Sequence, residues 1–278
     1  MNSFRVTLLA LALGLTTASA ASAQTKTTAK KTTTTTKKTT TTAKKPAAKT
    51  TAKTTTTKTT VKPATPVTPP APVVQPLTAD EATAAVREAL NLSVTRAVEA
   101  GGQPDAFNTN PDIRLGFPPE AELVSTTLRG LKMGAVVDKF EVQMNRAAEA
   151  VAPQAATILA GAVQRLTIAD ALALVNTRES RVAAQLLKQQ AQAQVQQELR
   201  PLMDAALEQT GAKQAYGELM LRYKKIPLVT PITTNLTDYA TQKTAEGLFT
   251  LIADEESRIR LNSSARTTAT LKRAFGSN

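Results

Sequence analysis

The chain has 278 residues, of which 42% are hydrophobic and 3% aromatic, and it contains no Cys, His or Trp. Without His or Cys, it cannot build a Ser-His-Asp triad, a thiol nucleophile, or a metal site with His or Cys ligands. Twelve cations and no acid precede Asp80, which leaves 22 cations and 22 acids from there onward, so the net charge of +12 belongs to the N-terminal part alone.

Residues 1–23 have the organisation of a secretory signal peptide. Arg5 supplies a positive charge, residues 6–15 form an apolar run, and the Ala-Ser-Ala at 21–23 fits an A-x-A cleavage site. The apolar run is too short to span a bilayer, and no later segment is long and apolar enough to do so. We therefore expect an exported protein, periplasmic or secreted, with no transmembrane segment.

Residues 24–77 are predicted to form a disordered tail. Residues 24–62 are almost entirely Thr, Lys and Ala, and residues 63–77 are rich in Pro. The first stretch has almost no apolar side chain to bury, so nothing offsets the entropic cost of ordering it, about 1–2 kcal/mol per residue. The tail lysines could hold the protein to an anionic envelope surface, or the tail could be a plain solubilising spacer. Because the tail lacks Arg and aromatic residues, we expect no specific nucleic-acid binding.

Residues 78–278 are predicted to form one all-α domain, a multi-helix orthogonal bundle. A capping box at Thr78-x-x-Glu81 begins the first helix, and Gly101-Gly102 ends it. A loop rich in Pro, Asn and Asp runs to Pro119, and helices are predicted at about 120–131 and through 136–151.

The second half of the domain is also predicted to be helical. Thr167-x-x-Asp170 resembles a cap for a short helix through Val175, and the Gln- and Ala-rich stretch 180–199 reads as a largely exposed helix that Pro201 breaks or kinks. Thr237 is predicted to cap the longest late helix. Its outer face is expected to carry two i, i+4 ion pairs, Asp254–Arg258 and Glu256–Arg260. A last helix ends at Gly276.

Several motifs, in order, resemble a bacterial family known only as domain of unknown function 4197. The most specific is Phe140-Glu141-x-x-Met144-Asn145-Arg146-Ala147-Ala148-Glu149. The others are Pro104-Asp105-x-Phe107-x-x-Asn110-Pro111, Thr167-Ile168-x-Asp170-Ala171, Tyr223-x-x-x-Pro227-Leu228, Leu236-Thr237-Asp238-Tyr239, Gly247-Leu248-Phe249, Ile252-Ala253-x-Glu255-Glu256 and Arg266-Thr267-Thr268-x-x-Leu271-Lys272-x-x-Phe275-Gly276. The sequence departs from the family near Asn176, where relatives usually have a Gly-Pro turn followed by aromatic residues. The resemblance implies an exported, all-helical bacterial protein with no assigned activity.

Four polar residues, Glu141, Asn145, Arg146 and Glu149, are the candidate binding residues, because they gather along one edge of a predicted amphipathic helix. The favoured interpretation is structural, with an i, i+3 ion pair between Arg146 and Glu149 and with Asn145 bonded to a neighbouring loop. As a catalytic pair, Glu141 and Glu149 would be separated by a helical rise of about 12 Å. The two carboxylates of a glycosidase lie roughly 5–9.5 Å apart, so this pair would fit only if the side chains leaned towards each other, and Glu141 could instead pair with an acid from another helix.

The leading hypothesis is a non-enzymatic envelope or secreted protein, with a binding or structural helical domain and a basic tether. The alternative is a carboxylate-based hydrolase acting on cell-wall glycan. We expect no catalytic residue, cofactor or metal, and the sequence does not identify a protein partner.

Overall fold

The computed structural model describes residues 75–227, 229 and 232–276. The signal peptide predicted for 1–23 and all but the end of the predicted tail at 24–77 lie outside the described residues. All the described residues belong to one compact unit.

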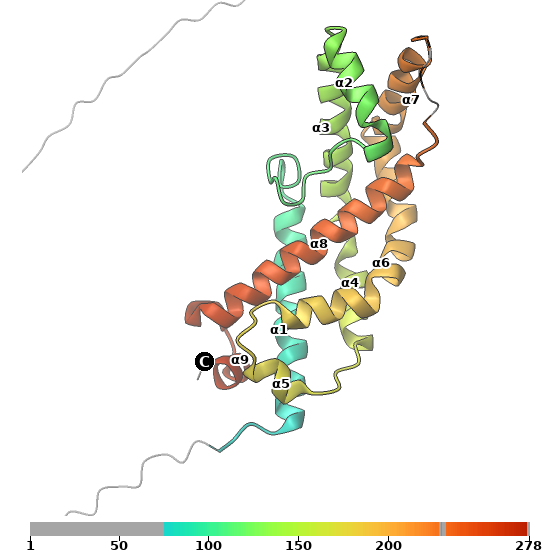
Figure 1. Ribbon diagram of the computed structural model, residues 1–278. Coiled ribbons are helices and arrows are strands. Elements are labelled where there is room, and N and C mark those ends of the chain that lie inside the picture. The colour runs from blue at the N-terminus through green and yellow to red at the C-terminus, as the bar shows by residue number, and fades with distance from the viewer. Residues whose placement is uncertain (1–74, 228, 230–231, 277–278) are drawn as a thin grey trace, which may run out of the picture. The chain divides into compact units, whose positions relative to one another are not determined.

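The described residues form helices and no strands, which confirms the predicted all-α class. The α-helices, with two 3₁₀ turns between them, are α1 (Ala79–Gly101), η1 (Pro119–Ala121), α2 (Glu122–Gly130), α3 (Gly134–Val151), α4 (Ala155–Arg165), α5 (Ala171–Asn176), α6 (Val182–Gln209), α7 (Ala212–Tyr223), α8 (Leu236–Leu261), η2 (Ser263–Ala265) and α9 (Ala269–Phe275). Helix α8 packs on both α1 and α6, and it crosses α1 obliquely (Figure 1). Helix α3 packs on α6 and α7, so the core lies between α1, α3, α6 and α8.

Helix α1 begins as predicted. The Thr78 side chain accepts a hydrogen bond from the Glu81 amide, and the Glu81 carboxylate accepts one from the Thr78 amide, which completes the capping box. The buried face of α1 carries four alanines, Ala82, Ala85, Ala89 and Ala97. These small side chains let α1 approach its neighbouring helices closely.

The prediction that residues 180–199 form a largely exposed helix is wrong. Helix α6 is a core element that packs against α8, α3 and α4. It buries a stripe of residues, namely Ala183, Ala184, Leu187, Ala191, Val195, Leu199, Met203, Ala206 and Leu207. Because alanines supply much of this stripe, it looked thinly apolar in the sequence. Pro201 lies inside the helix and does not end it.

Two predicted caps are displaced by a few residues. Asp170 itself, and not Thr167, is the N-cap of α5, where its carboxylate accepts the Ala173 amide. Helix α8 is capped by Asn235, while the Thr237 hydroxyl donates to the Asp204 carboxylate. Side chains with oxygens at neighbouring positions compete for the same cap, and sequence spacing does not decide between them.

The two ion pairs predicted on the outer face of α8 are also corrected. Asp254 pairs with Arg181, at the start of α6, at 2.7 Å. Glu256 does bond Arg260 at 2.8 Å, but this pair is buried. The Glu256 carboxylate also accepts the amides of Ala183 and Ala184 at 3.1 and 2.7 Å, so α8 caps the N-terminus of α6.

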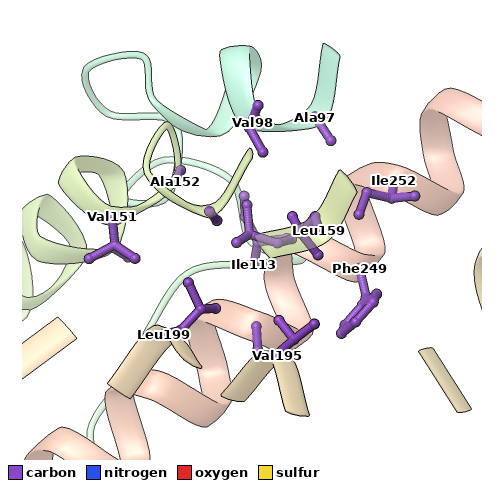
Figure 2. Close-up of a cluster of buried hydrophobic side chains, with 14 of the residues drawn as sticks. Ala97, Val98, Ile113, Val151, Ala152, Leu159, Val195, Leu199, Phe249 and Ile252 are labelled. Carbon is purple, nitrogen blue, oxygen red and sulfur yellow. The ribbon is translucent and has the colours of Figure 1, made fainter. Parts of the chain in front are cut away.

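The loop between α1 and η1, residues 102–118, is anchored in the core. Ile113 lies among side chains of α1, α3, α4, α6 and α8 (Figure 2). Phe107 is fully buried, and both residues approach Gly247 of α8. A Cβ atom at position 247 would lie 2.9 Å from Phe107 Cε1 and 3.2 Å from Ile113 Cβ. The absence of a side chain at Gly247 therefore allows the loop to sit against α8.

We predict that Gly247→Ala destabilises the protein. Alanine favours a helix over glycine by about 0.5–1 kcal/mol, but overpacking a buried contact costs typically 1–3 kcal/mol, so the net change should be a loss. Gly217 of α7 is the matched control, because a Cβ there meets nothing within 4 Å. Denaturant unfolding should show a stabilisation for Gly217→Ala and the opposite sign for Gly247→Ala. Stabilisation by both substitutions would contradict this account of the loop.

Candidate functional site

The four residues predicted on α3 do gather along one edge of that helix. Each of them bonds a residue of the loop at 102–118. Glu141, Asn145 and Glu149 are buried, although all are polar, and Arg146 is partly exposed. Buried polar groups of this kind need bonding partners. The structure supplies them from the loop backbone and from arginines.

Asn145 holds the backbone of Leu115 at both of its polar groups. The Asn145 Oδ1 atom accepts the Leu115 amide at 2.9 Å, and Nδ2 donates to the Leu115 carbonyl at 2.9 Å. The same Nδ2 also donates to the Glu141 carbonyl at 2.8 Å. Both Asn145 and Leu115 are fully buried, so no solvent replaces these bonds. The prediction that Asn145 bonds a neighbouring loop is confirmed.

Glu149 and Arg146 hold the first part of the loop. The amides of Phe107 and Asn108 donate to Glu149 Oε1 at 3.1 and 3.4 Å. Arg146 donates to Glu149 Oε2 at 2.8 Å, which confirms the predicted i, i+3 pair, and also to Asp105 at 2.8 Å. Hydrogen bonds from the Asn108 side chain and then from Arg146 lower the pKa of Asp105, while Glu149 and then Asp105 raise the pKa of Arg146.

Glu141 holds the end of the loop through Arg114. The Arg114 guanidinium donates to Glu141 Oε2 at 2.6 Å, and Arg129 of α2 lies 3.4 Å from Oε1. Guanidinium or amide donors therefore engage both carboxylate oxygens of Glu141 and of Glu149. With its oxygens occupied, neither acid is placed to protonate a leaving group or to attack a substrate.

Tyr239 of α8 holds the loop from the opposite side. Its hydroxyl lies 3.1 Å from the Gly116 carbonyl and 3.2 Å from the Phe117 carbonyl. Burial, followed by the negative charges of Glu246 and three other glutamates, raises the pKa of Tyr239 to about 12. The phenol is thus a neutral donor under ordinary conditions.

The loop fixed in this way forms one wall of a polar cavity of about 290 Å³. The loop contributes Asp112, Ile113 and Arg114, and α6 contributes Lys188. Helix α8 supplies the rest of the lining, namely Tyr239, Lys243, Glu246, Gly247 and Thr250. None of the four predicted site residues lines this cavity. Glu141 is nevertheless bonded to a lining residue, Arg114.

Sequence reasoning missed the lining residues of this cavity. Asp238-Tyr239 and Gly247 belong to motifs of the resemblance, but Asp112 and Lys188 carry no pattern of their own. They come together only because the loop, α6 and α8 meet in the fold.

Among the residues that the structure describes, no three His, Cys, Asp or Glu side chains group in a way that could hold a metal ion. In that same part of the chain, no helix combines the length and the apolar character needed to cross a membrane.

Comparison with known proteins gives one match. The model of a family described as "Protein of unknown function (DUF4197)" matches residues 76–276, which include all the helices described above. No curated protein matches the chain, and no solved structure does.

We predict that Asn145→Ala destabilises the domain by roughly 2–4 kcal/mol, because it leaves the buried amide and carbonyl of Leu115 without partners. Asn91 of α1 is the matched control, since its side chain bonds no described residue; Asn91→Ala should change stability by about 0.5 kcal/mol or less. Hydrogen exchange should show the Leu115 amide exposed faster in the Asn145 variant only. Equal stabilities for the two variants would disprove the clamp.

We predict that Tyr239→Phe loses its destabilising effect at high pH. Because the folded-state pKa is about 12 and that of an unfolded tyrosine about 10, the contribution of the phenol is complete below pH 10 and is lost as pH rises towards 12. The difference in unfolding free energy between wild type and variant should therefore shrink over that range. A difference that stays constant or grows would show that Tyr239 ionises normally.

Proposed function

Since this chain belongs to the DUF4197 family of proteins of unknown function, we propose its role from its own residues: an exported, non-enzymatic binding or structural protein. Its helical domain would act in the cell envelope or outside the cell. The basic segment before Asp80 would tether that domain to an anionic surface such as lipid head groups or cell-wall carboxylates.

The observation that carries the non-enzymatic part of this proposal is the use of the α3 acids. Glu141 and Glu149 bond arginines and loop amides, so they position a loop. The sequence supplies no His or Cys to replace them as catalytic groups. Nothing in the cavity geometry favours the alternative of a glycan hydrolase built on Glu141 and Glu149.

The tether rests on the distribution of charge. Eleven lysines lie between residues 24 and 62, with no acid among them, whereas the part from Asp80 onward has as many acids as cations. A basic segment near an anionic bilayer gains about 1 kcal/mol for each Lys close to the surface. A segment with eleven lysines could therefore hold a domain that has no net charge at that surface.

We predict that replacing all the tail lysines by Gln abolishes retention on anionic vesicles of phosphatidylglycerol and on sedimented peptidoglycan. The positions are Lys26, Lys30, Lys31, Lys37, Lys38, Lys44, Lys45, Lys49, Lys53, Lys58 and Lys62. Wild type should be retained below about 0.1 M salt and released towards about 1 M, where the Debye length falls to about 3 Å.

The matched control replaces eleven threonines of the same segment by Gln, which changes as many side chains without changing charge. This control should bind as wild type does. If wild type is not retained at low salt, or if the lysine variant is retained equally, the tether proposal fails.

A further inference from the structure

Three of the five charges that line the cavity between the loop, α6 and α8 are held in ion pairs. Lys243 bonds Glu246 at 2.8 Å. Arg114 bonds Glu141, which lies behind the cavity wall, at 2.6 Å. The opposite charges within each pair cancel, so these two pairs attract an ion of either sign only weakly.

Two charges in this lining, Lys188 and Asp112, form no direct ion pair, although Lys188, after Lys243 and Gln242, helps to lower the pKa of Glu246. Neither the Lys188 ammonium nor the Asp112 carboxylate bonds any residue in the described ranges 75–227, 229 and 232–276. Lys188 projects from α6 and is partly buried, while Asp112 is exposed on the loop. One cavity thus presents a cation on one wall and an anion on another, neither of them held by a direct bond to a described residue.

A second, smaller cavity of about 160 Å³ adjoins the first, because Lys188 and Thr250 line both. It follows the seam between α6 and α8 and is also lined by Arg181 and Phe249. Arg181 is paired with Asp254. The seam therefore gives space on the far side of Lys188 without adding an unpaired charge.

We propose that this cavity binds a small zwitterion of the amino-acid or short-peptide class. The ligand carboxylate bonds Lys188, and the ligand ammonium bonds Asp112. This ligand class matches both unpaired charges at once, and it suits a lining with little apolar surface besides Ile113. The inference rests on the proposed role of the domain as a binding module.

Other ligand chemistries fit the lining less well. A polyanion would meet Asp112 and Glu246 as well as Lys188, because the lining carries three cations and two acids. An apolar ligand would have to desolvate the charged groups without replacing their hydration. A zwitterion that bonds one group of each sign avoids both costs.

The test uses the full chain and calorimetric titration with alanyl-alanine, compared with its N-acetyl and its C-terminal amide forms. Alanyl-alanine should bind about tenfold or more tightly than either blocked form, because each blocked form leaves one charged group of the cavity without its partner.

The variants separate the two ends of the ligand. Lys188→Gln should weaken dipeptide binding about tenfold and remove the preference for the free dipeptide over its amide, while the preference over the N-acetyl form remains. Asp112→Asn should do the reverse. Lys139→Gln and Asp80→Asn, outside the cavity, are the matched controls and should bind as wild type does.

Three results would overturn the proposal. These are no binding of the dipeptide, equal binding of the blocked forms, or variants that lose affinity without the predicted switch in preference. Tighter binding of the N-acetyl form, strengthened by Asp112→Asn, would instead identify an anion site. The titration does not measure retention at an anionic surface, so its outcome is independent of the tether proposal.

Discussion

The loop that shapes the proposed site depends on one buried side-chain amide. Asn145 satisfies both backbone groups of Leu115, at a position where no water can do so. A backbone amide or carbonyl left unpaired in such a place costs about 1–3 kcal/mol. Because Leu115 is held, Arg114 beside it reaches Glu141, and Ile113 fills the core (Figure 2). Asp112 is then carried to the rim of the cavity. The candidate residues of α3 thus act on that cavity from behind its wall.

The same device recurs across the domain: a long polar side chain from one element satisfies the backbone of another. Arg87 of α1 donates to the carbonyls of Val163, Gln164 and Leu166 at the end of α4. Glu256 of α8 caps α6, and Gln190 of α6 bonds both backbone groups of Thr167. Helix ends that would otherwise be orphaned are therefore closed by tertiary contacts.

This device explains what the sequence could and could not predict. The helical class, the capping box at Thr78 and the Arg146–Glu149 pair follow from short spacings, and all three are present. Glu256 also has a short-range partner in Arg260, which the spacing predicted. Its bonds to α6 join residues more than 70 positions apart, so the sequence indicated an exposed ion pair and not the buried cap that the structure shows. Lys188 and Asp112 were missed for the same reason, since only the packed fold makes them neighbours.

Helix α8 is needed by nearly every other part of the domain. It packs on α1 and α6, caps α6, accommodates the loop at Gly247 and bonds it through Tyr239. Yet α8 begins only at Leu236, after most of the helices it contacts. While the chain emerges from the ribosome, α1 and α6 are therefore made long before α8, their main packing partner. Their apolar faces stay uncovered until α8 is made. The order of the helices along the chain thus delays closure of the core until α8 has been made.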